Sequence, residues 1–187
     1  MNDRQIRTPG EVAKRVIVLL GIFQAATGRK KAEVIEILKE HHLWKELYEI
    51  ERKFLLTPSE ETKFEAIQFG WRSEAVFILL WALQLIEQKE IPVDETNLDL
   101  IFHLLKDNEY YKKIDVKNAQ LRNTDEILEL LDQIQIIHWE LRDATIHNKE
   151  PPNNYHPSII YEWFYALNWL VRPNEDWDYI TTDTQKF

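Results

Sequence analysis

The middle of the chain contains an unbroken apolar run, from Ala75 to Leu83. The exposed face of an amphipathic helix would interrupt such a run with polar residues, so a helix formed here would be buried on all sides. The run is too short to cross a bilayer, which takes about 20 apolar residues. Leu, Ala and Trp outweigh the β-branched residues, and the pattern continues to Glu87, which is too long for an ordinary strand. The pattern therefore predicts a central buried helix over about residues 71–87.

A second segment, about residues 158–171, is apolar except at Glu162 and Asn168 and is followed by Pro173. A helix of this composition is buried on nearly all sides. The segment therefore predicts a second near-fully buried helix.

Between these two segments of the sequence, a long helix is predicted from Thr124 to about His147. Apolar residues recur there at helical spacing behind a helix-start pattern at residues 123–126. Trp139 lies among charged residues on a second face of this helix, which suggests that this face is covered too. The residues on this second face are Leu128, Asp132, Gln135, Trp139 and Arg142.

The remaining helices are shorter. The periodicity predicts them over about residues 9–26, 31–41, 43–55, 57–70 and 96–106, and the alternation at residues 113–117 allows a brief strand. The fold class is therefore all-α. We expect one compact helical domain over residues 1–187, with residues 1–8 as a flexible tail.

The amino-acid composition excludes several kinds of functional site. The chain has no cysteine, which excludes disulfides, thiolate catalysis, iron–sulfur clusters and cysteine-ligated zinc. It has only 4 glycines and no phosphate-binding loop or dinucleotide-binding fingerprint, so we expect no cofactor. Asp3 and Glu11 interrupt the first apolar positions, which argues against a signal peptide. Since no membrane-spanning run follows, the sequence predicts a cytoplasmic protein that does not contact membranes.

The net charge of −9 is unevenly distributed. Residues 1–56 contain 11 Lys/Arg and 8 Asp/Glu, a net charge of +3, whereas residues 57–187 contain 12 Lys/Arg and 24 Asp/Glu, a net charge of −12. A negative field repels the phosphate backbone of nucleic acids. The charge therefore disfavours nucleic acid as a partner and favours a basic protein.

Five charged residues lie in or beside the predicted buried helices: Arg72, Glu74, Asp132, Arg142 and Glu162. An unpaired buried charge costs several kcal/mol, so these side chains should find partners. One hypothesis is a structural ion-pair network that determines how the helices pack. The other is a polar pocket at the helix junction, in which Arg72 or Arg142 holds an anionic ligand.

Glu162 permits a sharper prediction, because few cations can reach it. The arginines after residue 56 are Arg72, Arg122, Arg142 and Arg172. Arg172 is ten residues further along the same predicted helix, and Arg122 precedes the long helix. We therefore expect Glu162 to lie within hydrogen-bonding reach of Arg72 or Arg142.

Arg142 and His147 match the R-x-x-x-x-H pattern of the helical HEPN ribonucleases, in which Arg and His flank the scissile phosphate. The resemblance implies a metal-independent ribonuclease that uses these two residues. The two lie roughly 140° apart around a continuous helix at 100° per residue, so they converge only if the helix ends before His147.

The acidic end of the chain offers a weak metal hypothesis. Asp176, Asp178 and Asp183 carry oxygen ligands of the kind that Mg²⁺ and Ca²⁺ prefer, but their spacing matches no known loop. The alternative is that these residues cap turns and helices, with Trp177 anchoring the end of the chain.

Several patterns together are similar to one bacterial family. They are Trp71-Arg72-x-Glu74-Ala75 followed by Leu80-Trp81-Ala82-Leu83, Asp176-Trp177-Asp178 with Thr182-Asp183-Thr184, Val12-Ala13-Lys14-Arg15, and His138-Trp139-x-x-Arg142. Over nearly its whole length the chain resembles the family called domain of unknown function 4272. The resemblance implies a compact helical bacterial protein and brings no reaction. It also leads us to expect Arg after Glu162, where this chain has Trp163.

These observations favour a non-catalytic binding protein that acts through an acidic surface on a basic partner. An inhibitor or an immunity-type protein would be one form of this function. The alternative is the ribonuclease with Arg142 and His147.

Overall fold

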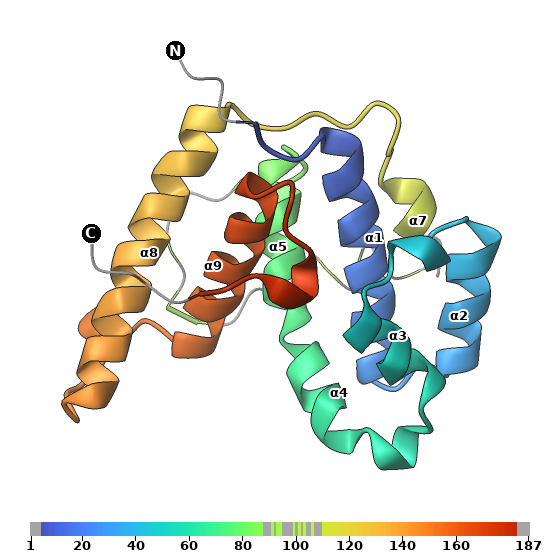
Figure 1. Ribbon diagram of the computed structural model, residues 1–187, viewed down its shortest axis with the longest axis horizontal. Coiled ribbons are helices and arrows are strands. Elements are labelled where there is room, and N and C mark those ends of the chain that lie inside the picture. Colours follow the sequence, from blue (N-terminus) through green and yellow to red (C-terminus); the bar gives the residue numbers. More distant parts are fainter. Residues whose placement is uncertain are drawn as a thin grey trace.

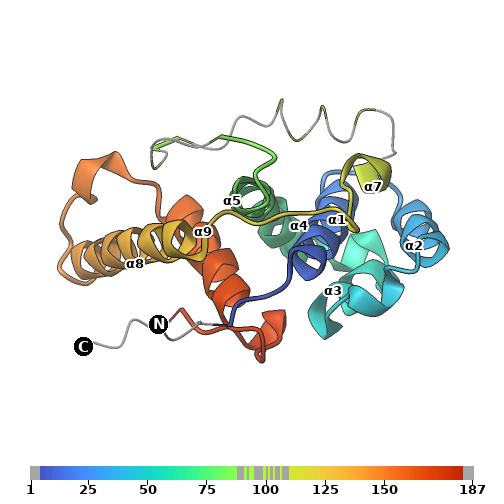
Figure 2. The same ribbon diagram turned by 90° about the horizontal axis from the view of Figure 1, so that it is seen from above.

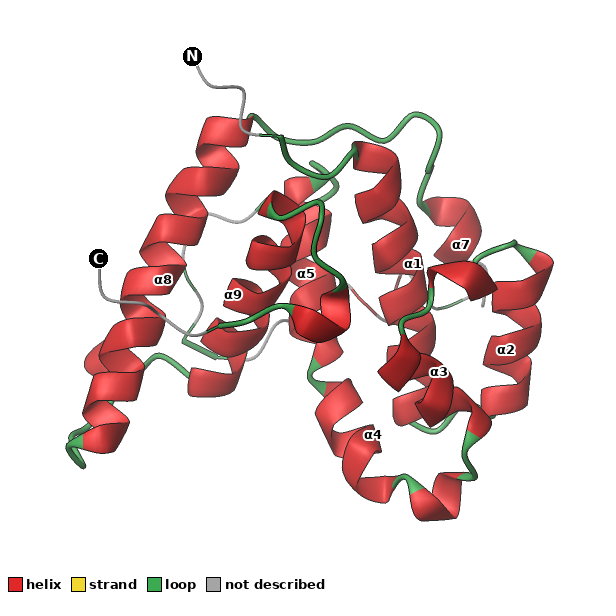
Figure 3. Cartoon of the chain, viewed as in Figure 1, coloured by secondary structure: helices red, strands yellow, loops and turns green. Residues whose placement is uncertain are grey.

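The structure is a computed structural model that describes residues 5–87, 91, 93, 94, 99, 101, 103, 106 and 110–182. Within these residues every regular element is helical and none is a strand, so the predicted all-α class is confirmed (Figure 3). The α-helices are α1 (Pro9–Ala26), α2 (Lys31–Glu40), α3 (Glu49–Leu56), α4 (Lys63–Gly70), α5 (Arg72–Ala82), α7 (Tyr110–Lys113), α8 (Thr124–Ile146) and α9 (Pro157–Val171). The short 3₁₀ turns are η1 (Trp44–Glu46), η2 (Ser59–Glu61), η3 (Pro152–Asn154) and η4 (Trp177–Tyr179).

The helices follow one another across the molecule in the order α8, α9, α5, α1 and α2 (Figure 1). In this series α9 packs between α8 and α5, while α5 packs between α9 and α1. The view from above shows the same order, with α8 at one edge and α2 at the other (Figure 2). No helix in the described ranges combines the length and the apolar character needed to cross a bilayer.

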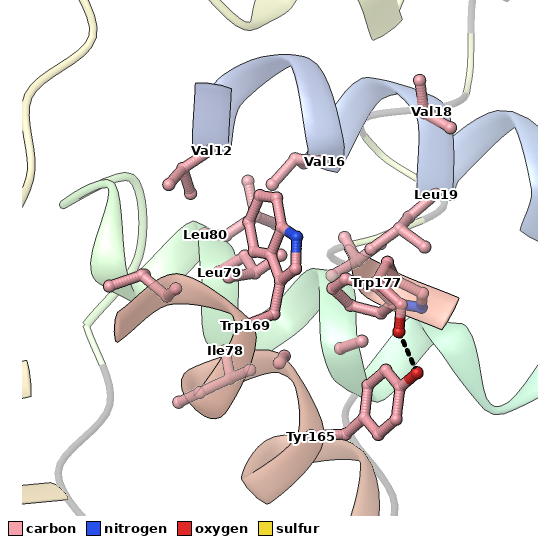
Figure 4. Packing of buried hydrophobic residues seen from close by; sticks show 14 of the residues in the cluster. Val12, Val16, Val18, Leu19, Ile78, Leu79, Leu80, Tyr165, Trp169 and Trp177 are labelled. Atoms are coloured by element: carbon pink, nitrogen blue, oxygen red, sulfur yellow. Dashed lines mark hydrogen bonds between the residues drawn. The ribbon is translucent and has the colours of Figure 1, made fainter. Parts of the chain in front are cut away.

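Three helices supply most of the core. In α5 every residue from Ser73 to Ala82 is buried except Phe77, and in α9 every residue from Ile159 to Leu170 is buried except Tyr161. Both predicted buried helices are therefore confirmed. α1 is buried to the same extent, from Val12 to Ala25 except Lys14. Apolar side chains of the three helices meet around Trp169 and Trp177 (Figure 4).

The central helix is shorter than predicted, because α5 ends at Ala82 rather than near Glu87. The chain turns at Gln84, which has a left-handed backbone with φ of 61°. The early end of α5 is explained by contacts with Arg122, which is distant in the sequence. The Arg122 backbone N–H donates to the Ala82 carbonyl, and its side chain donates to the Trp81 carbonyl (2.8 Å each), so carbonyls at the end of α5 are satisfied without another helical turn.

Three other predicted elements differ from the structure. The pattern at Thr57 begins the single turn η2 rather than a helix, and α4 starts only at Lys63. The predicted helix at 43–55 is divided into η1 and α3. The predicted strand at 113–117 is wrong, because Lys113 ends α7 and the Asp115 carboxylate accepts the N–H groups of Lys117 and Asn118, which closes a turn. The predicted helix at 96–106 lies mostly outside the described residues.

Arg7 lies within the predicted flexible tail, yet it is buried against the end of α9. Its backbone N–H donates to the Leu170 carbonyl (3.0 Å), its Nε donates to the Trp169 carbonyl (2.8 Å), and its Nη2 donates to the carbonyls of Arg172 and Glu175. The carbonyls of Trp169 and Leu170 belong to the last turn of α9, where no further helical turn supplies N–H donors. Arg7 therefore caps α9, and the tail prediction is wrong for this residue.

A lysine closes another helix in the same way. The Lys31 ammonium donates to the carbonyls of Phe54 (2.7 Å) and Thr57 (2.9 Å) at the end of α3, and it lies 3.9 Å from the centre of the Phe54 ring. Burial lowers the pKa of Lys31 below its ordinary value. Arg7, Lys31 and Arg122 thus each join a distant part of the chain to the negative end of a helix.

Candidate functional site

Arg72 and Glu162 form a buried ion pair between the first residue of α5 and the middle of α9. The Arg72 Nη1 lies 2.7 Å from Glu162 Oε2 and 2.9 Å from Oε1. The side chains are 18% and 7% exposed. Burial acts to lower the pKa of Arg72, but the adjoining Glu162 carboxylate outweighs it and raises this pKa. The prediction that Glu162 lies within hydrogen-bonding reach of Arg72 or Arg142 is therefore confirmed, and the partner is Arg72.

A second buried pair, Arg15 with Glu51, was not predicted from the sequence. Both guanidinium Nη atoms of Arg15 donate to the Glu51 carboxylate, Nη1 at 2.9 Å, and the side chains are only 2% and 1% exposed. Glu51 also accepts the Tyr48 backbone N–H (3.1 Å), so it closes the start of α3. One signal was present in the sequence, because Lys14 and Arg15 are the two charged residues between Val12 and Ala26 of α1.

Trp177 lies between the two ion pairs and joins them. The guanidinium carbon of Arg15 is 4.1 Å from the centre of its ring, and that of Arg72 is 5.6 Å away. The Tyr165 hydroxyl donates to the Trp177 carbonyl, which holds η4 against α9 (Figure 4). Trp177 is 1% exposed. The predicted role of Trp177 as an anchor for the end of the chain is confirmed.

Glu74 is also buried, one turn beyond Trp71 on α5. The Trp163 indole N–H donates to Glu74 Oε2 at 3.3 Å, and the Trp163 ring stacks on Phe77 with centroids 6.0 Å apart. Trp163 stands where the resemblance led us to expect Arg. In this chain a neutral donor therefore contacts the Glu74 carboxylate from that position.

A cavity of about 490 Å³ opens between α8, the first half of α9 and the junction of α4 with α5. Arg142 and Glu162 both line it, so the structure brings two of the five predicted site residues to one cavity. Arg72 forms its ion pair with Glu162 and is not itself one of the residues that line the cavity. The other lining residues are Gln68, Trp71, His138, Leu141, Thr145, Ile146, Pro157, Ser158 and Tyr161.

The cavity wall is held in place by aromatic contacts. Trp71 stacks on His156, the residue before α9, with centroids 5.3 Å apart. His138 packs against Phe164 with centroids 4.9 Å apart. Burial raises the pKa of Tyr161 above its ordinary value, which favours the protonated hydroxyl. The wall therefore offers fixed rings and hydrogen-bonding groups.

Asp132 does not join the buried charges, because the second face of α8 is not covered. Asp132, Trp139 and Arg142 are all exposed, and Trp139 retains 43% of its accessible surface. The physical reason is that α8 lies at the edge of the molecule and packs on α9 through its other side (Figure 1). The prediction that this face is covered is wrong.

Arg142 and His147 lie at the end of α8. The helix ends at Ile146, as their convergence would require. The His147 Nδ1, however, lies 2.9 Å from the Asp143 carbonyl and 3.1 Å from its carboxylate, whereas Arg142 lines the cavity, of which His147 forms no part. These contacts direct the two side chains to different neighbours.

In the described part of the acidic end, Asp178 caps a helix, whereas Asp176 occupies the N-cap position of η4 without a side-chain hydrogen bond there. Asp178 Oδ2 accepts the Ile50 N–H (3.1 Å) at the start of α3, and Asp176 precedes η4. Asp183 lies outside the described residues. Among the residues that the structure describes, no group of three or more His, Asp or Glu side chains is arranged to share a metal ion.

Comparison of the chain with known proteins identifies a family. The model of a family described as Domain of unknown function (DUF4272) matches residues 1–180, which include both ion pairs, the cavity and Trp177. No curated protein and no solved structure matches the chain. Because the family model covers nearly all of the 187 residues, the chain belongs to the DUF4272 family.

Proposed function

We propose that this chain is a non-catalytic binding protein that recognises a basic protein through the outer face of α8. This face consists of six residues that share one stripe at about 100° per residue. They are Asp125, Glu129, Asp132, Ile136, Trp139 and Glu140. The observation that carries the proposal is this combination of carboxylates and exposed apolar side chains on one helix face.

The charge of α8 favours a cationic partner. Six of its residues are Asp or Glu, and Arg142 is its one Lys or Arg, so the helix carries a net charge of −5 with His138 neutral. A field of this sign attracts basic surfaces over about 10 Å at moderate salt and repels acidic ones. The −12 charge of residues 57–187 adds to this field.

Ile136 and Trp139 are exposed apolar side chains that can act as anchors for a partner at the centre of this face. Ile136 is 59% exposed and Trp139 is 43% exposed, and both lie between Asp132 and Glu140 along the helix. Interfaces commonly have apolar or aromatic anchors within a polar rim, and tryptophan is enriched among the residues that contribute most to binding. The fitting partner is a helix or loop that carries an apolar residue flanked by Lys or Arg. An inhibitor or immunity-type protein would use such a face to cover a basic target.

The test uses a synthetic amphipathic helical peptide of Leu and Lys, with binding measured by fluorescence anisotropy at several salt concentrations. We expect saturable binding that weakens as salt rises, and we expect the double substitution E129K/D132K to reduce it at least tenfold. The matched control is E36K/E40K, which reverses two exposed charges on α2. Equal binding by the E129K/D132K protein would contradict the proposal.

A further inference from the structure

We propose that the open pocket beside Trp139 binds one arginine side chain of the basic partner. The inference rests on the proposed function, and it makes that function specific by naming a residue that the partner must supply. The pocket has a volume of about 340 Å³ and lies between the last turns of α8 and the loop that follows this helix.

The loop after α8 turns back against the helix and forms one wall of the pocket. Asn148 has a left-handed backbone with φ of 50°, and the Lys149 backbone N–H donates to the Ala144 carbonyl at 2.8 Å. The turn η3 then packs against α8, which brings Pro152 and Asn153 to the pocket. Hydrogen bonding and packing therefore hold the loop wall in place beside the helix.

Trp139 supplies the aromatic surface of the pocket and keeps 43% of its accessible surface. The face of an indole ring attracts cations, and tryptophan is the best aromatic side chain for this contact. The protein already uses the contact in its core, where the guanidinium carbon of Arg7 lies 4.1 Å from the centre of the Trp169 ring. That of Arg15 lies equally close to Trp177. Among the residues that the structure describes, none places a cation over Trp139, so its exposed ring is open to a cation from a partner.

Carboxylates in the same pocket can balance the charge of such a cation. Glu140, Asp143 and Glu150 all line it. Asp143 is already engaged, because its carboxylate oxygens lie 3.1 Å from His147 Nδ1 and 3.6 Å from Lys149 Nζ. Within the described ranges no cation pairs with Glu140 or Glu150. These two carboxylates can therefore accept hydrogen bonds from an incoming side chain.

Arginine suits this arrangement better than lysine. A guanidinium is planar and weakly hydrated, so it can lie flat on an indole ring while its edge donates parallel hydrogen bonds to a carboxylate. Trp139 and Glu140 are consecutive residues that line one pocket, which allows a single guanidinium to contact both. An ammonium is a compact, strongly hydrated charge without this flat surface.

The test compares two amphipathic helical peptides of equal length, one of Leu and Lys and one of Leu and Arg, by fluorescence anisotropy with the full chain. The Leu/Arg peptide should bind at least about fivefold tighter, as expected for a partly desolvated cation–π contact. W139A should reduce this ratio to less than about twofold while both peptides still bind. E140Q keeps the shape of the side chain and should also lower the ratio.

The matched control is I136A, which truncates the other exposed apolar side chain at the centre of the face. It should weaken both peptides by the same factor and so keep the arginine preference. Thermal unfolding establishes that each variant is folded.

The outcomes separate this inference from the proposed function. Binding of both peptides with equal affinity, or an arginine preference that W139A leaves unchanged, would overturn the arginine pocket while the proposed function stands. A preference that I136A lowers as much as W139A would also overturn it, because the preference would then belong to the whole face of α8. Binding of neither peptide would overturn both.

Discussion

One nitrogen of Arg72 contacts both carboxylate oxygens of Glu162, a residue 90 positions further along the chain. The contact joins the start of α5 to the middle of α9, with the two side chains only 18% and 7% exposed. Removing two charges from water is costly, and a buried pair recovers the cost only when both partners remain. The pair therefore adds little net stability over apolar packing, but each of its members depends on the other.

Glu162→Gln should lower the free energy of unfolding by about 3 kcal/mol, because it leaves the Arg72 charge buried without its counter-ion. Urea unfolding followed by circular dichroism measures the loss. Glu129→Gln, which neutralises an exposed carboxylate on α8, is the matched control and should change the stability by less than about 0.5 kcal/mol. Equal stability of the two variants would show that the pair does not hold α5 to α9.

The contact of Glu162 could be predicted because the chain offers few arginines near apolar helices. The Arg15–Glu51 pair could not be predicted on the same grounds. Glu51 lies in a segment with charges at Glu49, Arg52 and Lys53, and nothing local shows which of these four turns inward. Only the packing of α3 against α1 selects Glu51.

Two predictions failed because local pattern does not reveal distant partners. The apolar residues after Ala82 continue the helical pattern, yet α5 stops there since Arg122 occupies the carbonyls at its end. Trp139 suggested a covered face on α8, yet it lies beside Pro152 and Asn153 of η3 and stays 43% exposed. Hydrophobic periodicity identifies elements well, but it does not tell a buried face from one that remains open for a partner.

Trp81→Ala should cost about 3–5 kcal/mol of stability, as expected for truncation of a buried aromatic side chain. Trp81 is 7% exposed, and the Arg122 guanidinium lies 5.0 Å from the centre of its ring. Trp139→Ala makes the same change at an exposed site and should cost less than about 1 kcal/mol. Thermal unfolding of both variants provides the comparison, and an unchanged melting temperature for W81A would place its side chain outside the core.

Arg7→Gln should lower the free energy of unfolding by about 2 kcal/mol, because it removes charge-assisted hydrogen bonds to the end of α9 and the stack on Trp169. Gln5→Ala, two residues earlier at an exposed position, should have almost no effect. Loss of these hydrogen bonds should also speed amide hydrogen exchange in the last turn of α9. This faster exchange should occur in R7Q and not in Q5A. If residues 5–8 behaved as a flexible tail, both substitutions would be silent.

RNA incubated with the purified protein in the presence of a metal chelator should remain intact. Arg142 lines the cavity while His147 contacts Asp143, and the surrounding helix carries a net charge of −5, which repels the phosphate backbone. Gel electrophoresis of a labelled RNA is the measurement, with His147→Ala as the comparison. Degradation by the native protein that disappears in H147A would favour the ribonuclease alternative over the binding function.

Asp178 provides a prediction that depends on pH. Its carboxylate accepts the Ile50 N–H at 3.1 Å, and burial together with the nearby Glu51 raises the pKa of Asp178 above its ordinary value. A carboxyl whose pKa is higher in the folded state favours folding when it is protonated, so its contribution is present at low pH and is lost as the pH rises through the folded pKa. The folded protein therefore carries a destabilising charge here at neutral pH.

Asp178→Asn should keep the acceptor for Ile50 without this charge, so at pH 7 it should be at least as stable as the native protein. Asp178→Ala removes the acceptor and should cost about 1 kcal/mol, as for loss of a helix cap. As the pH falls toward 4, the native protein should gain stability relative to D178N, because Asp178 becomes protonated in the folded state before it does in the unfolded chain. Urea unfolding of the three proteins at pH 4.5 and pH 7 measures these differences. A native protein that loses stability relative to D178N on acidification would mean that the pKa of Asp178 is lowered rather than raised.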